Sequence, residues 1–243
     1  MRNIVVDRGN TRTKIGVFER GVLTAHYNEL SAIVLEQLNI QPADRIMASS
    51  VGPGLEEVKA LFPDGIAWTN FDRSLNLPVK LDYETPETLG VDRIAAAVGA
   101  ITKLPSTNVL VIDAGSCITM DLVTKDQVFH GGVISPGIRM RFKSMHVFTD
   151  KLPQIDWPPM DETTLTIPGL STQQCMRAGV LKGIQYEMEG YVRHYSGLYP
   201  DLKVIMTGGD AQYFENIINT PIFTEDSLVL IGLNRVLEYN NVA

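Results

Sequence analysis

The sequence predicts an α/β protein made of two duplicated lobes with a ligand cleft between them. Strand-like and helix-like apolar patterns alternate along the whole chain, which is typical of α/β lobes. The length of 243 residues suits two lobes, each of roughly 100–120 residues. A short motif that begins at Asp7 begins again at Asp113, and this repeat is the third observation behind the prediction.

The internal repeat sets the division of the chain. Asp7–Lys14 and Asp113–Met120 share aspartate, glycine and threonine at their first, third and seventh positions. Each copy follows one strand pattern and precedes another, as a hairpin tip does. The offset between the copies is too long for a solenoid and indicates duplicated lobes. We therefore predict an N-terminal lobe over 1–104 and a C-terminal lobe over 105–243, with a ligand cleft between them.

In the first lobe, short apolar runs are separated by turn residues. Asn3–Val6 and Ile15–Phe18 predict a hairpin with a polar tip. The elements expected after this hairpin are a helix over 32–39, a strand over 45–50, a helix over 55–62, a strand over 66–68, a loop over 70–87 and an alanine-rich buried helix over 90–103.

The second lobe repeats this alternation. Strands are expected over 109–112 and 118–123, followed by a helix over 138–149. The spacing of Met140, Phe142, Met145 and Phe148 predicts the core face of that helix. The elements expected after it are an irregular segment over 151–169, a long helix capped by Ser171 that runs through Tyr199, a strand that breaks at Gly208 and Gly209, and a closing helix over 228–237.

Composition and charge exclude several classes of protein. The 28 acidic residues outnumber the 21 basic ones and give a net charge of −7, which is not the basic footprint of a non-specific nucleic-acid binder. The longest apolar run, Ile94–Ile101, is eight residues long, whereas a membrane span needs about 20. Cys117 and Cys175 form no C-x-x-C pair, so we expect two buried free thiols. These observations predict a cytoplasmic protein without nucleic-acid or membrane partners.

Asp7–Lys14 is a candidate phosphate-binding loop. A glycine at a hairpin tip lets backbone amides approach a ligand, and the hydroxyls of Thr11 and Thr13 and the Lys14 ammonium can bind phosphate oxygens. Asp7 ends its strand, where a carboxylate suits Mg²⁺. A plain turn explains the same residues, but the second copy, with Ser116 in the hydroxyl role, favours a binding site.

A second candidate lies at the start of the alanine-rich helix. Gly90 opens the helix, and Asp92 and Arg93 fall in its first turn, where unpaired amides bind anions. Arg93 can hold a carboxylate with two hydrogen bonds, and Asp92 can accept a proton from a substrate hydroxyl. The alternative is structural, because acids favour first helical turns and Arg93 can pair with Glu87.

These motifs resemble those of type III pantothenate kinases, which belong to the acetate and sugar kinase/Hsp70/actin superfamily. Asp7–Lys14 matches D-x-G-N-T-x-x-K, Tyr83–Arg93 matches Y-x-x-P-x-x-L-G-x-D-R, Asp113–Asp121 resembles D-x-G-T-A-x-T-x-D, Gly131–Gly137 matches G-G-x-I-x-P-G and Thr207–Asp210 matches T-G-G-D. Two departures stand out: Arg8 replaces a small or aliphatic residue, and Ser116-Cys117 replaces Thr-Ala.

The resemblance implies two actin-like (ribonuclease H-like) lobes and the ATP-dependent phosphorylation of pantothenate, the first step of coenzyme A biosynthesis. It also implies Mg²⁺, a monovalent cation (K⁺ or NH₄⁺) and a homodimer. The implied roles are Asp92 as proton acceptor; Asp7, Arg8, Gly9, Asn10, Thr11, Arg12, Thr13, Lys14 and Ser116 for ATP, with Asp7 acting through Mg²⁺; Tyr83, Gly90, Val91, Asp92, Arg93 and, by a looser match, Thr172 for pantothenate; and Asp113 for the monovalent cation.

Two alternatives to this kinase stay open from the sequence. One is a catalytically silent nucleotide-binding regulator of the same fold, and the other is a kinase that acts on a different sugar or carboxylate. The joint presence of Asp7, Asp92, Arg93 and Asp113 favours an enzyme, because a pure binder has no need of a base. The Tyr83–Arg93 motif favours pantothenate over other acceptors.

Overall fold

Two β-sheets and the helices around them make up the described part of the chain, which in this computed structural model is residues 2–9, 12–50, 52, 54–158, 165–215, 217–218 and 220–241. The chain divides into two compact units. Unit one comprises Met1–Val111, Asp121–Gly131 and Ser227–Ala243, and unit two comprises Ile112–Met120 and Gly132–Asp226. The lobe boundary between 104 and 105 stays a prediction.

The first sheet has five strands in the order β3-β2-β1-β4-β5. The predicted hairpin is confirmed, because β1 (Arg2–Arg8) pairs antiparallel with β2 (Thr13–Glu19). The strand β3 (Val22–Tyr27), which the sequence analysis missed, continues antiparallel beside β2. On the other side, β4 (Arg45–Ser50) runs parallel to β1, and β5 (Ala67–Asn70) runs parallel to β4.

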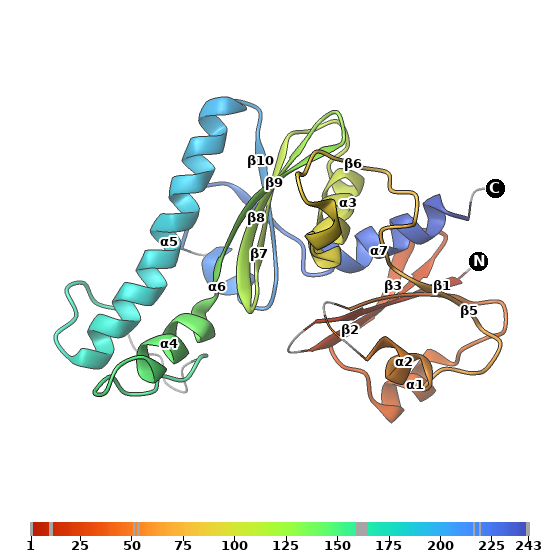
Figure 1. Ribbon diagram of the computed structural model, residues 1–243, viewed down its shortest axis with the longest axis horizontal. Helices are drawn as coiled ribbons and strands as arrows, with labels where there is room; N and C mark the ends of the chain where they lie inside the picture. The colour runs from red at the N-terminus through yellow and green to blue at the C-terminus, as the bar shows by residue number, and fades with distance from the viewer. Residues whose placement is uncertain are drawn as a thin grey trace. The chain divides into compact units, whose positions relative to one another are not determined.

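Helices cover both faces of this sheet within unit one. Figure 1 shows α1 (Ala32–Leu38) and α2 (Leu55–Lys59) on one face and α7 (Leu228–Tyr239) on the other. Alternate side chains of a strand point to opposite faces, and Ile4 and Val6 of β1 accordingly share one core cluster with Val34 of α1 and Val58 of α2. This buried layer fixes the position of the β1–β2 hairpin.

The second sheet repeats the topology of the first. Its order is β11-β10-β7-β8-β9-β6, so β9-β8-β7-β10-β11 corresponds to β3-β2-β1-β4-β5. The predicted duplication is thereby confirmed at the level of strand order. The strands are β6 (Lys80–Leu81), β7 (Val109–Ala114), β8 (Cys117–Thr124), β9 (Val128–Pro136), β10 (Lys203–Thr207) and β11 (Ile222–Thr224).

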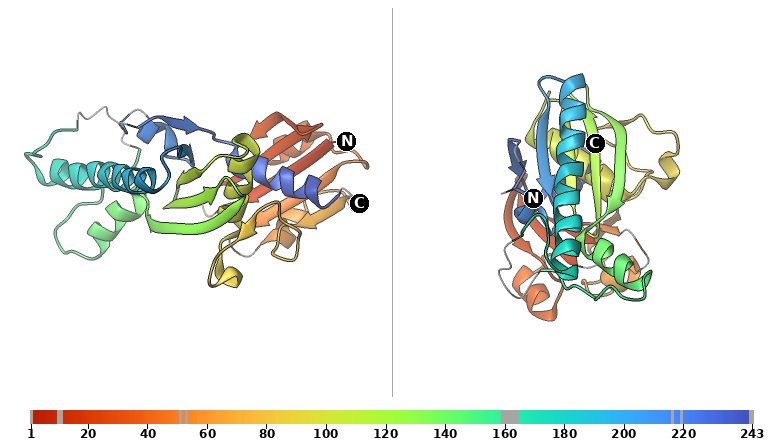
Figure 2. Two further views of the ribbon diagram at one scale, coloured as in Figure 1. Left: turned by 90° about the horizontal axis from the view of Figure 1, so that it is seen from above. Right: turned by 90° about the vertical axis from the view of Figure 1, so that its left-hand side faces the viewer.

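The remaining helices begin at identifiable residues. The long helix α5 (Thr172–Leu198) starts as predicted, with Ser171 Oγ accepting a hydrogen bond from the Gln174 amide at 3.3 Å. Figure 2 shows α5 lying along the strands of unit two. The others are the 3-10 turn η1 (Pro86–Thr88), α3 (Val91–Lys103), α4 (Ile138–Val147) and α6 (Ala211–Glu215).

Close packing of α3 against α7 depends on two glycines. A Cβ atom on Gly232 of α7 would collide with the carbonyl oxygen of Ala95, and one on Gly99 of α3 would collide with the carbonyl oxygen of Leu228. Both contacts lie inside unit one. The backbones of α3 and α7 are therefore in direct contact at Gly99 and Gly232.

Two expectations about burial are wrong. Phe142 of α4 is buried, but Met140 and Phe148, predicted on the same core face, are 44% and 83% exposed. The helix buries only a narrow stripe at Ile138 and Phe142, which are one turn apart. Both cysteines are free, as expected, but neither is buried: Cys117 is half-buried and Cys175 is exposed.

Candidate active site

The carboxylate of Asp7 stands at the end of β1, between two neighbouring strands. Asp7 lies opposite Lys14 in the antiparallel pairing with β2 and beside Ser49 in the parallel pairing with β4. The hydroxyl of Ser49 donates a hydrogen bond to Asp7 Oδ1 at 2.8 Å, and Ser49 itself is fully buried. One carboxylate oxygen is thus held by the sheet.

The electrostatic surroundings of Asp7 connect it to Asp92. Burial raises the pKa of Asp7, and the negative charge of Asp92 raises it further, while the hydrogen bond from Ser49 and the charge of Lys14 act in the opposite direction. The structure therefore brings together the predicted magnesium ligand and the predicted base. A cation bound at Asp7 would relieve the repulsion between the two carboxylates.

The rest of the hairpin tip is only partly described. The Gly9 amide donates to the Arg12 carbonyl at 3.0 Å, which closes the turn. Arg8 reaches the connection between β4 and α2, where its Nη1 donates to the Gly54 carbonyl at 2.5 Å and lies 3.5 Å from Glu57 Oε2. These contacts direct the Arg8 side chain toward the start of α2. Asn10 and Thr11, predicted to bind ATP, lie outside the described residues.

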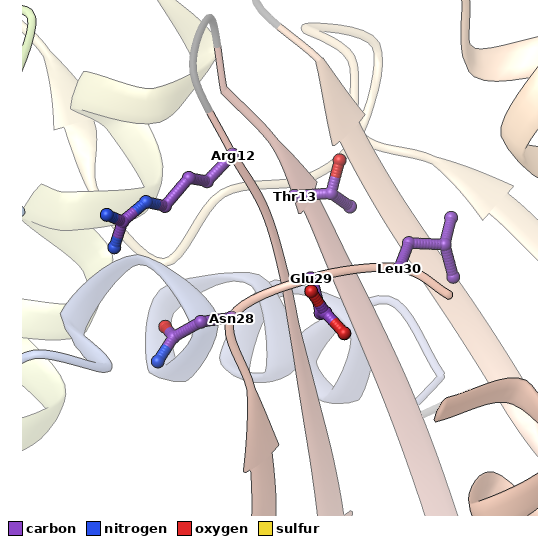
Figure 3. A pocket seen from close by; sticks show the side chains of 5 residues that line it. All are labelled: Arg12, Thr13, Asn28, Glu29 and Leu30. Carbon is purple, nitrogen blue, oxygen red and sulfur yellow. The ribbon is translucent and has the colours of Figure 1, made fainter. Parts of the chain in front are cut away.

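A pocket of about 530 Å³ opens beside this hairpin in unit one. Figure 3 shows Arg12 and Thr13 from the start of β2, and three residues that follow β3. The guanidinium of Arg12 brings a positive charge to the lining and Glu29 a negative one. The pocket is lined by Arg12, Thr13, Asn28, Glu29 and Leu30. Two of these residues belong to the predicted phosphate loop, so the pocket adjoins that loop.

The carboxylate of Asp92 folds back over Gly90 at the start of α3. Asp92 Oδ1 accepts a hydrogen bond from the Arg93 amide at 2.9 Å. A Cβ atom on Gly90 would stand only 2.5 Å from that same oxygen. Gly90 is the N-cap residue, and its missing side chain leaves room for the carboxylate. Gly90, at the predicted helix start, and Asp92, the predicted base, therefore lie in contact in the first turn of α3.

Arg93 is buried and paired, but not with the partner considered from the sequence. Its Nε donates to Asp121 Oδ2 at 3.0 Å and its Nη2 donates to Asp121 Oδ1. Arg93 is 7% exposed and Asp121 is 2% exposed. The alternative pairing with Glu87 is wrong, because Glu87 is exposed on η1 while Asp121 enters from β8.

Tyr83 packs against this ion pair. The Cζ atom of Arg93 lies 5.7 Å from the Tyr83 ring centroid and 5.7 Å from that of Phe129. Gly131 has a φ of +75°, and a Cβ atom there would stand 3.0 Å from the edge of the Tyr83 ring. Glycine at this position thus permits the positive φ angle and leaves room for the Tyr83 ring.

In unit two, the end of β7 forms a second compact turn. The Asp210 amide donates to the Ala114 carbonyl at 2.9 Å and the Gly137 amide to the Ser116 carbonyl at 3.1 Å. Gly208 has a φ of +101°, and a Cβ atom there would stand 2.5 Å from both the Ala114 carbonyl oxygen and Asp113 Oδ1. The segment around Gly208 therefore lies against the half-buried carboxylate of Asp113, while Gly137 lies against the turn that follows it.

The other predicted residues of unit two lie at its surface. Ser116 is exposed at the tip between β7 and β8, and Thr172 is exposed at the first position of α5. Near the Gly208–Gly209 turn, the carboxylate of Asp210 accepts a hydrogen bond from the Trp157 indole at 2.9 Å. The Trp157 ring stacks edge-on against Tyr213, with centroids 4.9 Å apart. This contact anchors the irregular segment before residue 159.

The donor set at Asp7 fits a magnesium ion that is shared with nucleotide phosphates. Among the described residues, no three His, Cys, Asp or Glu side chains are grouped so as to hold a metal on their own. Magnesium prefers one or two carboxylates and completes its shell with phosphates and water. The single strand-end carboxylate, with a second one nearby, provides that arrangement.

The sequence analysis missed three residues that shape the site: Ser49, Asp121 and Phe129. Asp121 carried a signal, because it is the last residue of the motif that begins at Asp113. Ser49 ends a strand predicted over 45–50, but only the parallel pairing of β4 with β1 places it beside Asp7. Phe129 carried no polar signal and acts through packing alone.

Known proteins resemble this chain over almost its whole length. A family model described as type III pantothenate kinase matches residues 3–194. A protein of that name from Cytophaga hutchinsonii is 42% identical over 241 residues, which are 98% of this chain and 99% of that protein. Another from Phocaeicola vulgatus is 38% identical over 244 residues, which are 98% of this chain and 99% of that protein.

A solved structure supports the fold. Component A of the (R)-2-hydroxyglutaryl-CoA dehydratase from Acidaminococcus fermentans matches with a TM-score of 0.53 at 14% identity, over 99% of this chain and 97% of that chain. The predicted sugar kinase/Hsp70/actin-like fold is thereby confirmed. Among the helices in the described ranges, none combines the length and apolar character needed to cross a bilayer.

Proposed function

This chain belongs to the type III pantothenate kinase family, and from that premise we propose which of its residues carry the reaction. The protein phosphorylates pantothenate with ATP as co-substrate, and a divalent cation accompanies the nucleotide. This reaction begins the synthesis of coenzyme A. Neither the family model nor the relatives support the alternative of a silent regulator.

Asp92 is the proton acceptor in this proposal. The pantothenate hydroxyl oxygen bonds to the γ-phosphorus of ATP while the bond from that phosphorus to the β,γ-bridging oxygen breaks, and ADP leaves. The hydroxyl proton passes to the Asp92 carboxylate. The observation that carries the proposal is the position of the Asp92 carboxylate at the start of α3, where Oδ1 accepts a hydrogen bond from the Arg93 amide and lies over Gly90.

The phosphates of ATP are bound by the two hairpin tips. In unit one we assign this role to Asp7, Arg8, Gly9, Asn10, Thr11, Arg12, Thr13 and Lys14, and in unit two to Ser116. When bound, Mg²⁺ neutralises phosphate charge, and Asp7 is its protein ligand. The hydrogen bond from Arg8 Nη1 to the Gly54 carbonyl restrains this side chain next to the loop.

Pantothenate is bound by residues around the start of α3. Tyr83, Gly90, Val91 and Arg93 match the family motif for this substrate, and Thr172 is a further contact by a looser match. The grouping of Tyr83 with Arg93 and of Gly90 with Asp92 supports this assignment. Arg93 suits the substrate carboxylate because a guanidinium binds carboxylates with paired, charge-assisted hydrogen bonds.

Asp113 is the ligand of the monovalent cation, K⁺ or NH₄⁺. Potassium prefers several oxygen ligands, and backbone carbonyls serve this purpose in proteins. The Ala114 carbonyl oxygen and Asp113 Oδ1 both lie 2.5 Å from the position of a Cβ atom on Gly208, so one carbonyl oxygen and one carboxylate oxygen are close together. This grouping supports a cation site in unit two.

The active form is a homodimer located in the cytoplasm. Several large apolar side chains of unit two are exposed, and their burial by a partner would be favourable. They are Ile134, Met140, Val147, Phe148, Ile167, Leu170, Tyr186 and Leu198. A second copy that covers some of these side chains would remove apolar area from water, and light scattering would then give twice the chain mass of 26.9 kDa. The two free cysteines suit a reducing compartment.

The variant Asp92→Asn tests the assignment of the base. Asparagine keeps the size of the side chain but cannot take the proton, so we expect turnover to fall by about 10²–10⁴-fold with the melting temperature unchanged. Coupled ADP release measures the turnover. Asp126→Asn is the matched control, because Asp126 is exposed in the turn between β8 and β9. Near-normal turnover in Asp92→Asn would remove Asp92 from this role.

A further inference from the structure

The ion pair between Arg93 and Asp121 is enclosed by the fold, with Arg93 7% and Asp121 2% exposed. Both oxygens of the Asp121 carboxylate are engaged, one by Arg93 Nε at 3.0 Å and the other by Nη2. Asp121 thus occupies one whole edge of the guanidinium. A carboxylate ligand that approaches Arg93 must use the other edge, at Nη1, because a planar guanidinium offers its donors in fixed directions.

Aromatic rings hold the guanidinium from two further directions. The Tyr83 and Phe129 centroids are 6.0 Å apart, and the Arg93 Cζ atom lies 5.7 Å from each. Phe129 is fully buried, and the Arg93 guanidinium lies over the Tyr83 ring. The side chain of Arg93 is therefore confined on three sides by Asp121, Phe129 and Tyr83.

Charge compensation explains why a buried arginine can remain in this position. Burial of Arg93 acts to lower its pKa, but the hydrogen bonds and charge of Asp121, together with Tyr83, outweigh burial and raise the pKa. Arg93 thus stays charged. Without Asp121 the same guanidinium would be an uncompensated charge in the core, which proteins tolerate poorly.

We propose that Asp121 is a positioning residue for pantothenate binding: it holds the Nε–Nη2 edge of Arg93 so that the Nη1 edge faces the substrate carboxylate. This inference rests on the proposed contact between Arg93 and pantothenate. It assigns to Asp121 an effect on pantothenate binding that passes through the orientation of Arg93. A purely structural ion pair would instead affect stability and leave substrate binding unchanged.

The test compares Asp121→Asn with the wild type in steady-state kinetics. Asparagine offers one acceptor and turns an N–H toward the guanidinium, so Arg93 loses its fixed orientation. We expect the KM for pantothenate to rise roughly tenfold or more, the size of a lost charge-assisted hydrogen bond, with the KM for ATP unchanged. Isothermal titration with pantothenate alone should show the same loss of affinity.

A buried control separates positioning from stability. Asp44 is 3% exposed, and its Oδ2 atom lies 3.7 Å from Arg2 Nη1 in the same unit. Asp44→Asn should lower the melting temperature and leave the KM for pantothenate unchanged. If Asp121→Asn behaves in the same way, with only its stability reduced, the proposal is wrong and Asp121 is structural.

A double variant keeps the test decisive if Asp121→Asn folds poorly. Arg93→Met with Asp121→Asn removes both charges, which buried pairs tolerate better than the loss of one partner. If Asp121 acts only through Arg93, the double variant and Arg93→Met alone should have the same KM for pantothenate. A further rise in the double variant would overturn the proposal. An unchanged KM in Arg93→Met would overturn the Arg93 contact itself, which distinguishes the two failures.

Discussion

The Asp7 carboxylate is proposed to serve catalysis, but its burial as a charged group lowers the stability of the folded protein. The carboxylate is held by Ser49 and lies near Lys14, yet burial and the charge of Asp92 still raise its pKa. The folded protein therefore binds the Asp7 proton more tightly than the unfolded chain does. The contribution of Asp7 to the free energy of unfolding is therefore largest below its ordinary pKa of 3.8. This contribution is lost as the pH rises through the pKa of Asp7 in the folded protein.

Asp7→Asn should accordingly produce an inactive but more stable protein. Asparagine keeps an acceptor for Ser49 and removes the costly charge. We expect its melting temperature to exceed that of the wild type near pH 7.5, with a difference that shrinks as the pH falls toward 3.8. Thermal unfolding across this pH range measures the effect.

Asp72 provides a control, because its pKa is shifted in the opposite direction to that of Asp7. Hydrogen bonds from Ser74 lower the pKa of this exposed carboxyl, so Asp72 contributes stability above its ordinary pKa and loses it as the pH falls. Asp72→Asn should therefore be slightly less stable than the wild type near neutral pH. A less stable Asp7→Asn variant at pH 7.5 would contradict our reading of the Asp7 environment.

The local structure around the candidate site residues was predictable where these residues are neighbours in the sequence. Gly90, Asp92 and Arg93 are neighbours in sequence, so their helix start could be recognised directly. The partner of Arg93 could not, because Glu87 is close in sequence whereas Asp121 arrives only through the fold of β8. Long-range pairing of charges depends on the tertiary structure, which no local pattern encodes.

At the scale of elements, the crossing of α3 and α7 is the most sensitive contact. Gly232→Ala places a methyl group against the Ala95 carbonyl oxygen. Overpacking of this kind costs about 1–3 kcal/mol, partly offset by the better helix propensity of alanine. We expect a lower melting temperature, measured by thermal unfolding.

Gly190→Ala is the matched control for this substitution. Gly190 lies inside α5, and a Cβ atom there would meet nothing within 4 Å. The same chemical change should therefore be neutral or stabilising by up to about 1 kcal/mol. Equal effects of the two substitutions would show that backbone contact between α3 and α7 contributes nothing to stability.

Elements with a strong local signal were predicted well. The strand over 45–50 agrees with β4, and Ser171 caps α5 as expected. The two-residue β6 was missed inside a predicted loop, because strands this short exist only through pairing with a neighbour such as β9. The core face of α4 was wrong at Phe148, since apolar spacing alone does not say which side chains another element covers.

The whole molecule repeats one strand order in both sheets. The paired aspartate motifs predicted this duplication, because each marks the first hairpin of a sheet. The order also relates α3 to α7, since α7 follows β11 and α3 follows β5 after the short strand β6 and the turn η1. That α7 packs in unit one could not be read from the sequence, because helix packing depends on surfaces that form only after folding.

The central claim is that this chain transfers phosphate from ATP to pantothenate with the aid of a monovalent cation at Asp113. The most direct measurement is ADP release in a coupled assay with Mg²⁺, with and without pantothenate, in K⁺ or Na⁺ salts. The account predicts release that requires pantothenate and is faster in K⁺ than in Na⁺. Folded protein that releases no pantothenate-dependent ADP in either salt would contradict it, and equal rates in both salts would remove the cation site from Asp113.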